Sequence, residues 1–244
     1  MKKRLDVILV ERGLATSRER ACALILAGKV VVDNHRIDKA GRQVDLQADI
    51  RLKSGDIPYV SRGGVKLAGA LAAFELNVEG CIALDVGAST GGFTDCLLQH
   101  GAVRVYAVDV GYGQLAWPLR DDPRVINLER RNIRYLQPGD LAEVPGLAVI
   151  DASFISLAKV LPNTLRLLTS EADIVALIKP QFEVGKGQVG KGGIVKDSAL
   201  HDQVVERIRS LALELGCRVH GVIESPVAGS KGNREFLIHL QKKP

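Results

Sequence analysis

The sequence lacks the patterns that mark metal-binding, secreted and membrane proteins. Its four cysteines and five histidines show none of the spacings that metal sites use, so we expect no metal ligands among them. No apolar run approaches the roughly 20 residues that a membrane-spanning helix needs. The N-terminus also lacks the apolar segment of a signal peptide. We therefore expect a cytoplasmic protein that keeps its cysteines reduced and has no membrane segment.

The excess of positive charge lies in the first quarter of the chain. Residues 1–66 hold 14 basic and 8 acidic side chains, whereas residues 67–244 hold 19 and 20. A concentrated basic segment indicates a polyanionic partner such as a nucleic acid. A merely solvated surface explains the same charge equally well, so the charge alone does not decide between the two.

The first sixty residues read as a separate small module. Apolar residues recur at helical spacing in two short segments, which indicates two short helices. Thr16 or Ser17 caps the second helix, and Glu19 is placed for a capping box. Short apolar segments between residues 30 and 52 predict a small β-ribbon, so the module occupies residues 1–58 and has an α+β fold.

A mainly parallel sheet follows a short linker. Pro58, Gly63 and Gly64 break regular structure, which predicts a linker over residues 59–65. In residues 66–244 strands and helices alternate, as in an α/β sheet that helices cover on both faces. The loop 224–234 has no helical pattern, so the last strand is expected to run antiparallel. The predicted strands are 81–86, 103–108, 125–128, 147–151, 173–179, 217–223 and 235–240, and a long helix is predicted over 197–215.

The most informative stretch is Ala83-Leu-Asp-Val-Gly-Ala-Ser-Thr-Gly-Gly-Phe-Thr94, where a buried strand enters a glycine turn that opens a helix. Gly87, Gly91 and Gly92 let the backbone approach a ligand closely, and the helix start offers free N–H groups. The next strand ends in Asp109, about 20 residues on, where a carboxylate can accept from ribose hydroxyls. Because the spacing is not G-x-G-x-x-G, a nicotinamide cofactor fits poorly and S-adenosylmethionine fits better. A tight turn in an ordinary α/β protein is the alternative reading.

Charged residues stand at several predicted strand ends. Asp151 ends one strand and Lys179 ends the next. Glu235 begins the antiparallel last strand and so lies at the same edge, and Lys66 begins the helix before the first strand. Two lysines and two carboxylates can therefore converge, although each alone reads equally as a solvated charge. Lys179 is the hardest to dismiss, because it follows six largely apolar residues and burying an unpaired ammonium is costly.

These residue types suit methyl transfer to a sugar hydroxyl. Transfer from a sulfonium needs alignment and removal of a proton from the acceptor. A lysine held by carboxylates can orient a ribose 2′-hydroxyl and stabilise developing alkoxide charge. An exocyclic amine acceptor calls for a polar-Pro-Pro-aromatic turn, and Asp151-Ala-Ser-Phe154 contains no proline. A carbon-5 pyrimidine acceptor calls for a cysteine nucleophile, and no cysteine stands at a strand end facing the site.

Two family resemblances follow from the motifs. Residues 3–58 resemble the S4-like RNA-binding domain, on Arg4-Leu-Asp, Ser17-Arg-x-x-Ala21 and Gly28-Lys-Val-Val-Val-Asp33. Nearly the whole chain resembles the TlyA family, in which an S4-like domain is fused to an FtsJ/RrmJ-like ribose methyltransferase. The supporting motifs are Val60-Ser-Arg-Gly-Gly-Val-Lys-Leu67, Asp85-Val-Gly-Ala-Ser-Thr-Gly-Gly-Phe-Thr94, Asp151-Ala-Ser-Phe-Ile-Ser-Leu157, Lys179-Pro-Gln-Phe-Glu-Val-Gly185 and Gly232-Asn-Arg-Glu-Phe236.

The resemblance implies a fold, a reaction and a partner. It implies a class I methyltransferase (Rossmann-like) sheet, S-adenosylmethionine as cofactor and 2′-O-methylation of cytidine in ribosomal RNA. Members of the family with short ends tend to modify large-subunit RNA, which favours that substrate here. The expected partner is ribosomal RNA or a ribosomal subunit, no membrane is expected as a partner, and a monomer is the expected oligomeric state.

The resemblance also assigns roles to residues. The catalytic tetrad maps onto Lys66, Asp151, Lys179 and Glu235. The expected cofactor contacts, from the methionine part to the ribose and the adenine, are Asp85, Gly87, Ala88, Ser89, Gly91, Gly92, Asp109 and Asn132. The expected RNA contacts are Arg4, Arg18, Arg20, Lys29, Arg62, Lys186 and Lys191. The last two lie in a glycine-rich loop, residues 183–193, which we interpret as a lid that closes on the RNA backbone, with an ordinary flexible loop as the alternative.

Two other functions fit parts of the sequence. Proteins of this family often carry the name haemolysin, but lysis needs secretion or a membrane-active segment, and neither is visible. An RNA-binding protein with an inactive catalytic domain is disfavoured, because all four tetrad positions and the glycine turn are present.

Overall fold

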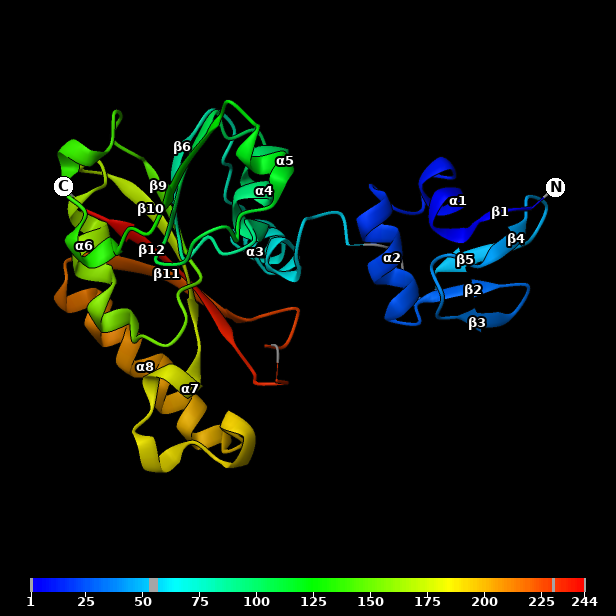
Figure 1. Ribbon diagram of the computed structural model, residues 1–244. Coiled ribbons are helices and arrows are strands. Elements are labelled where there is room, and N and C mark those ends of the chain that lie inside the picture. Colours follow the sequence, from blue (N-terminus) through cyan, green and yellow to red (C-terminus); the bar gives the residue numbers. More distant parts are fainter. Residues whose placement is uncertain (1, 53–56, 230, 244) are drawn as a thin grey trace. The chain divides into compact units, whose positions relative to one another are not determined.

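The computed structural model describes residues 2–52, 57–229 and 231–243. The chain divides into two compact units, residues 1–57 and residues 58–244 (Figure 1). Each unit has its own hydrophobic core. The division lies next to the boundary predicted after residue 58.

The N-terminal unit packs two helices against short strands. Helices α1 (Leu5–Glu11) and α2 (Arg18–Leu26) bury their apolar faces, including Leu24 and Ile25, in one core with the strands. The strands pair antiparallel in the orders β3-β2-β5 and β1-β4. Their bounds are β1 (Lys2–Arg4), β2 (Val30–Val32), β3 (His35–Ile37), β4 (Gln43–Asp45) and β5 (Ile50–Leu52).

The start of α2 differs from the prediction in one detail. The Ser17 hydroxyl accepts a hydrogen bond from the Arg20 amide at 3.1 Å, so Ser17 is the cap. The third helical position is then Arg20, and Glu19 stands one residue too early to complete a capping box. The predicted capping box is therefore wrong, although the helix begins where the sequence placed it.

The second unit is built on a mixed sheet with the strand order β11-β12-β10-β9-β6-β7-β8 among the described residues. Strands β10, β9, β6, β7 and β8 run parallel to one another, and β12 pairs antiparallel with both β10 and β11. The predicted antiparallel last strand is confirmed. The bounds are β6 (Ile82–Val86), β7 (Arg104–Asp109), β8 (Val125–Glu129), β9 (Leu147–Ile150), β10 (Ala172–Ile178), β11 (Cys217–Glu224) and β12 (Phe236–Lys242).

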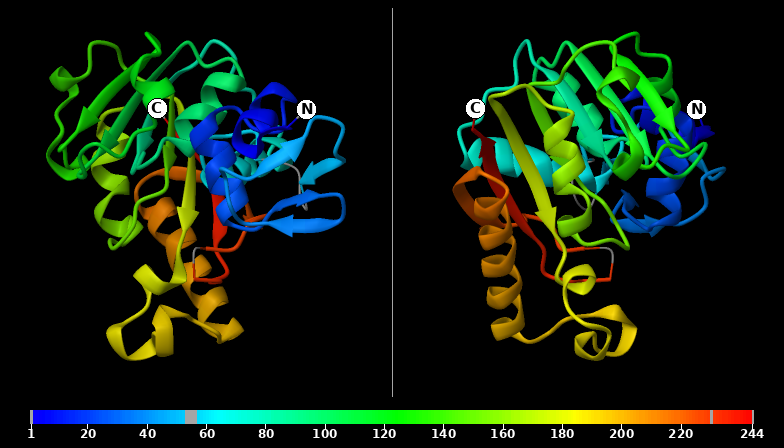
Figure 2. Two further views of the ribbon diagram at one scale, coloured as in Figure 1. Left: turned by 45° about the vertical axis from the view of Figure 1, so that its right-hand side comes forward. Right: turned by 90° about the vertical axis from the view of Figure 1, so that its left-hand side faces the viewer.

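Helices cover both faces of this sheet (Figure 2). Neighbouring strand residues point to opposite faces, so the two halves of the core separate. One half joins the sheet to α3 (Arg62–Ala73), α4 (Gly92–Gln99) and α5 (Trp117–Arg120). The other half joins it to α6 (Leu161–Arg166) and α8 (Ser198–Glu214). The short helix α7 (Pro180–Glu183) follows β10 directly. Among the described residues, none of the helices combines the length and the apolar composition needed to cross a bilayer.

The segment predicted as a linker belongs to the second unit. Helix α3 begins at Arg62, four residues before the predicted start, with the Ser61 hydroxyl accepting from the Gly63 amide at 3.2 Å. Two hydrogen bonds fix the preceding backbone to α4. The Val60 amide donates to a side chain of α4, and the Pro58 carbonyl accepts from another. Gly64 lies within this helix, and its packing against Tyr59 requires a glycine, because a Cβ there would lie 2.2 Å from the Tyr59 ring. Residues 62–65 are therefore helix, and the linker prediction is wrong for them.

Candidate active site

Two cavities adjoin where the carboxyl ends of the parallel strands meet. The charged cavity has a volume of about 470 Å³ and contains both lysines and both carboxylates of the predicted tetrad. The apolar cavity has a volume of about 580 Å³ and is lined largely by apolar side chains, among them Val86, Val108 and Ile133. The residues that line both are Gly87, Ser89, Asp151, Ser153 and Phe154.

The first ion pair of the charged cavity joins α3 to the start of β12. Lys66 Nζ lies 2.6 Å from Glu235 Oε2, and both side chains are buried, with exposed fractions of 9% and 4%. The other carboxylate oxygen of Glu235 accepts from the Gln181 amide at 3.4 Å. Glu235 is thus held from two sides, by residues 169 and 54 positions away in the sequence.

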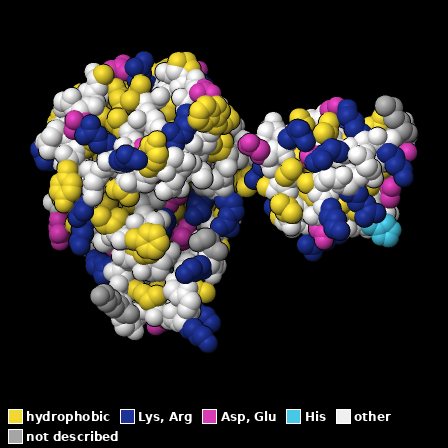
Figure 3. Space-filling view, viewed as in Figure 1, with side chains coloured by type: hydrophobic (Ala, Val, Ile, Leu, Met, Phe, Trp, Pro, Cys, Tyr) yellow, Lys and Arg dark blue, Asp and Glu magenta, His cyan; other side chains and the backbone are white. Residues whose placement is uncertain are grey.

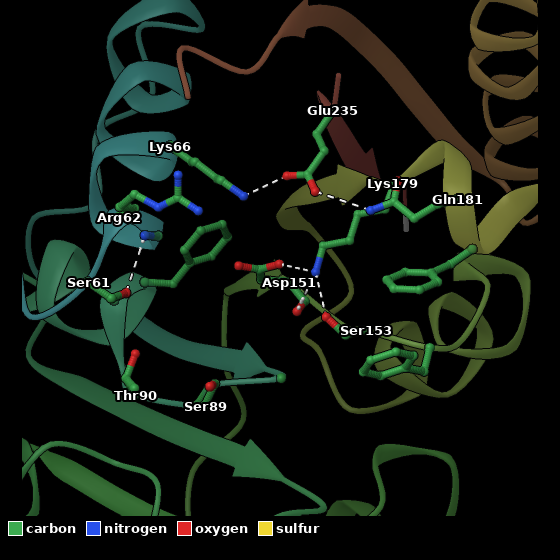
Figure 4. Close-up of a pocket in the computed structure, with 17 residues that line it drawn as sticks. Ser61, Arg62, Lys66, Ser89, Thr90, Asp151, Ser153, Lys179, Gln181 and Glu235 are labelled. Atoms are coloured by element: carbon green, nitrogen blue, oxygen red, sulfur yellow. Dashed lines mark hydrogen bonds and ion pairs between the residues drawn. The ribbon is translucent and has the colours of Figure 1, made fainter. Parts of the chain in front are cut away.

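The second ion pair joins the ends of two neighbouring parallel strands (Figure 4). Lys179 Nζ lies 2.6 Å from Asp151 Oδ1 and donates to the Ser153 hydroxyl at 2.8 Å. Its ammonium also stands 5.9 Å from the centre of the Phe182 ring. Because β9 and β10 pair in parallel register, their ends bring Asp151 and Lys179 to the same edge. The predicted convergence of the four charged residues is thus seen in the geometry, as two lysine–carboxylate pairs.

The glycine turn lies against the loop after β9. Gly87 has a φ of +85°, and a Cβ there would lie 2.9 Å from the Asp151 carbonyl oxygen. Only glycine fits this backbone, since the conformation is left-handed and the neighbouring atoms are main chain. The close approach joins the turn to the strand end that carries Asp151.

Asp109 lines the apolar cavity and is fixed by the backbone. Its Oδ2 accepts from the Ser89 amide at 2.8 Å and its Oδ1 accepts from the Gly111 amide at 2.7 Å. Asn132 lines the same cavity, and its side-chain oxygen accepts from the Arg134 amide. A carboxylate held in this way, beside an apolar pocket, can accept hydrogen bonds from the hydroxyl groups of a nucleoside sugar.

The remaining predicted cofactor residues divide into two groups. Ala88 and Gly92 line the charged cavity. Asp85 and Gly91 are not among the described residues that line either cavity. Asp85 is fully buried and accepts from the Thr94 amide and hydroxyl at 3.0 and 2.7 Å, and burial raises the pKa of its carboxyl to about 7.

Gly91 is part of the glycine turn and packs against α5 and the residues before it. Its φ is +90°, and a Cβ there would lie 2.3 Å from the Leu119 side chain. Asp85 and Gly91 therefore help to hold the glycine turn in shape, and their predicted contact with the cofactor stays a prediction.

The predicted RNA contacts of the N-terminal unit include two arginines around one carboxylate. Arg4 donates to both oxygens of Asp6 at 3.0 Å, and Arg18 donates to Oδ2 at 3.0 Å. Asp6 is buried, and the hydrogen bonds from Arg4 and Arg18 lower its pKa to about 2. The arginine side chains keep exposed fractions of 48% and 62%. Both guanidinium groups therefore have a structural partner and a solvent-facing surface.

The other predicted RNA contacts are dispersed. Lysine and arginine side chains are scattered over the visible surface of the N-terminal unit (Figure 3), and Arg20 and Lys29 are half-buried in it. In the second unit, Arg62 lines the charged cavity and Lys191 is exposed in the glycine-rich loop. The side chain of Lys186 lies outside what the structure describes.

Sequence reasoning missed several residues of the charged cavity. Ser153 and Gln181 each stand two positions after a predicted catalytic residue, and that spacing is the signal that could have found them. Phe154 is 90% exposed, has a φ of +62° and lies with its ring 5.0 Å from that of Phe182. Nothing in the sequence pattern distinguishes these two rings from core residues.

The arrangement has a defined chemical capacity. Two ammonium groups in a buried cavity can orient a hydroxyl and offset negative charge that develops on its oxygen. The adjoining apolar cavity can hold a flat heterocycle, with Asp109 at the sugar position. No group of three or more histidine, cysteine or carboxylate side chains converges as a metal site within the residues described.

Comparisons with known proteins identify the families of both units. Residues 59–242 match the model of the FtsJ-like methyltransferases, and residues 3–50 match that of the S4 domain. The 16S/23S rRNA (cytidine-2′-O)-methyltransferase TlyA of Mycobacterium tuberculosis is 50% identical, over 98% of this chain and 90% of its own. Hemolysin A of Brachyspira hyodysenteriae is 41% identical, over 97% of this chain and 99% of its own.

A solved structure resembles the chain over almost its full length. The protein comes from Streptococcus thermophilus and carries the name hemolysin. It is 47% identical, with a TM-score of 0.79, and the match covers 99% of this chain and 89% of that one. The likeness therefore includes both units.

Proposed function

The chain belongs to the FtsJ-like methyltransferases, with an S4 domain preceding the catalytic unit, and on that premise we propose that it methylates the ribose 2′-hydroxyl of a cytidine in ribosomal RNA. The observation that carries the proposal is the pair of lysine–carboxylate contacts in a cavity that shares its wall with an apolar, nucleoside-sized cavity. The donor is S-adenosylmethionine, and the reaction is a 2′-O-methyl transfer.

The residues of the apolar cavity fit this cofactor. Gly87 lines both cavities, and its lack of a side chain lets the turn pack directly against the Asp151 backbone that lines them too. Asp109 offers a fixed carboxylate for the ribose hydroxyls, and Asn132 lines the part of the cavity assigned to the adenine. When bound, the cofactor supplies a methyl group attached to a positively charged sulfur.

The charged cavity then receives the acceptor hydroxyl. Lys179 orients the 2′-hydroxyl and stabilises negative charge as its proton leaves, and Asp151 is the neighbouring carboxylate that can receive that proton. Lys66 adds a second positive charge, which Glu235 holds in place. The methyl group would come from the bound cofactor, and the proton lost from the hydroxyl would balance the positive charge that the cofactor loses.

Basic surface on the N-terminal unit supports a large RNA substrate. Arg4 and Arg18 present solvent-exposed guanidinium groups from the S4 domain, and Arg62 carries positive charge to the charged cavity. Phosphate contacts of this kind position a nucleic acid without reading its sequence. We take large-subunit RNA as the first substrate to test, and small-subunit RNA as the second, because the tuberculosis relative is named for both.

Mapping of methylated nucleotides tests the proposal. Ribosomal RNA from cells with and without the protein is digested, and 2′-O-methylcytidine is located by mass spectrometry. A methylated cytidine is expected only when the protein is present, and an identical map from both cell lines would refute the proposal.

The variant Lys179→Ala adds a residue-level prediction. It should lower methyl transfer by at least about a thousandfold, because it removes both the orienting group and the charge that stabilises the alkoxide. Lys179 lines only the charged cavity, so calorimetry should find cofactor affinity within about threefold of the unsubstituted protein. Equal loss of binding and transfer would give the lysine a structural role instead.

A further inference from the structure

One buried carboxylate near the charged cavity belongs to none of the assigned residues. Glu183 ends α7, four positions after Lys179, and its side chain is 3% exposed. Burial raises the pKa of this carboxyl above its usual range. A carboxylate kept in such a place costs stability unless its oxygens are satisfied, so its partners indicate what it does.

Both oxygens of Glu183 hold the loop that follows β9. Oε1 accepts from the Leu157 amide at 2.8 Å, and Oε2 accepts from the Ser156 hydroxyl at 2.7 Å. Arg207 of α8 stands 3.6 Å from Oε2 and also donates to the Glu183 backbone carbonyl. The carboxylate therefore fastens residues 156–157 to α7 and α8.

The fastened loop carries residues of the proposed reaction. Between the end of β9 and Ser156 lie Asp151 and Ser153, the two side chains that contact the Lys179 ammonium. The same stretch holds Phe154, whose left-handed backbone (φ +62°) costs energy that surrounding contacts must offset. The sheet fixes one end of this loop through β9, and Glu183 fixes the other.

We propose that Glu183 is a positioning residue for methyl transfer, which holds the 151–157 loop so that Asp151 and Ser153 meet Lys179. This inference rests on the proposed function, since it concerns the same charged cavity. Glu183 does not line either cavity among the described residues, so it acts through the loop and not on the substrate. Lys179 and Glu183 lie on one short segment, which gives the ammonium and its two partners a common anchor.

The test compares three variants with a matched control. Glu183→Ala should lower kcat by 10- to 100-fold at saturating cofactor and RNA, because the loop loses both contacts. Glu183→Gln should restore kcat to within about fivefold, since its amide oxygen can still accept from Leu157. Ser156→Ala should lower kcat severalfold, and should have no further effect in the Glu183→Ala background, where its partner is already gone.

The control is Asp173→Asn, on the same strand that leads to Lys179 but at the opposite end. Asp173 stands 2.7 Å from Nε2 of His239, away from both cavities. Its substitution should lower the melting temperature and leave kcat unchanged. Equal effects of Asp173→Asn and Glu183→Ala on kcat, calculated per folded protein, would overturn the inference, because they would reveal a general stabilising role.

Hydrogen exchange gives a readout that needs no activity. In Glu183→Ala, amides in residues 152–157 should exchange at least about tenfold faster, while those of β11 and β12 keep their rates. If the unsubstituted protein fails to methylate RNA, the proposed function falls, and the exchange rates still decide whether Glu183 anchors the loop. If it methylates RNA while kcat and exchange are the same in every Glu183 and Ser156 variant, only the anchoring role falls. Should Glu183→Ala not fold, the Ser156→Ala result decides in the same way.

Discussion

Two glycines at opposite ends of β6 allow the contribution of one close contact to be separated from that of backbone conformation. Gly80 precedes the strand and Gly87 follows it, and both have left-handed φ values, +73° and +85°. A Cβ on Gly80 meets nothing within 4 Å. A Cβ on Gly87 would lie 2.9 Å from the Asp151 carbonyl oxygen and 3.0 Å from the Ala152 Cα. Only the second substitution therefore forces two main-chain segments apart.

The magnitudes follow from these contacts. An alanine in a left-handed conformation costs roughly 1–2 kcal/mol, so Gly80→Ala should lower the free energy of unfolding by about that amount. Gly87→Ala carries the same cost plus roughly 1–3 kcal/mol of overpacking, because main-chain atoms cannot rotate away. The displaced segment lines both cavities, so cofactor affinity should fall at least about tenfold in Gly87→Ala and stay unchanged in Gly80→Ala.

Calorimetry measures both effects. Scanning calorimetry gives the stability of the two variants, and titration with S-adenosylmethionine gives their affinities. Equal destabilisation would show that the contact with the Asp151 backbone contributes nothing beyond backbone conformation. Unchanged cofactor affinity in Gly87→Ala would refute the placement of the cofactor at this turn.

Three further substitutions test single carboxylates. Asp109→Ala should weaken cofactor binding by about 10- to 100-fold in calorimetric titration, since it removes a charged acceptor and releases the Ser89 and Gly111 amides; unchanged affinity would contradict the ribose contact. Asp85 has its pKa raised to about 7 by burial, so the folded state keeps a proton that the unfolded chain loses, and stability should fall as pH rises from about 4 to about 7. Asp85→Asn should flatten that dependence in melting curves, and equal slopes would contradict the assignment. Asp6 has its pKa lowered to about 2, chiefly by Arg4, so its stabilisation is complete above about pH 4 and lost as pH falls toward 2. Asp6→Asn should remove this acid transition from the N-terminal unit, as followed by hydrogen exchange of α1 and α2, and a persistent transition would assign it to other groups.

The strands of the second unit could be predicted because buried strands form recognisable apolar runs in the sequence. Strand β10 lies between β9 and β12 and is covered on both faces, so it reads as a continuous apolar run, and its prediction was displaced by one residue. The long helix α8 was equally visible, since Asp197 caps it and the glycine after Leu215 ends it. In this helix Val204 and Ile208 are buried, while Leu200, Leu211 and Leu215 are half-buried.

The start of α3 could not be predicted, for a reason that lies outside its own segment. Gly63 and Gly64 read as helix breakers, yet they occupy the first turn of the helix. A Cβ on Gly64 would collide with Tyr59, and one on Gly92 would lie 2.1 Å from the Ser61 hydroxyl. These glycines serve close packing between α3, α4 and the preceding chain, and local propensity carries no information about such contacts.

Within the site, the sequence predicted which charges converge but not how they pair. Strand ends place side chains at one edge of a sheet, and that rule is enough to bring Asp151, Lys179 and Glu235 together. The pairing depends on register and on the position of α3, which only the structure supplies. The role of Glu183 could not be predicted for a related reason, since its partners, Ser156 and Leu157, lie in a loop without a periodic pattern.

The two ion pairs differ in their burial and in the cavities that they line, and these differences indicate different roles in the proposed reaction. Buried ion pairs are poor sources of stability, because the cost of desolvation offsets most of their attraction, so their retention at a cavity points to chemistry. Lys66 and Glu235 line only the charged cavity and are almost fully buried. Asp151 lines both cavities and is 22% exposed, and its partner Lys179 is 10% exposed. The donor and the acceptor must meet where the two cavities join, so we place the proposed methyl transfer beside Lys179 and Asp151, and we assign to Lys66 and Glu235 the holding of the acceptor within the charged cavity.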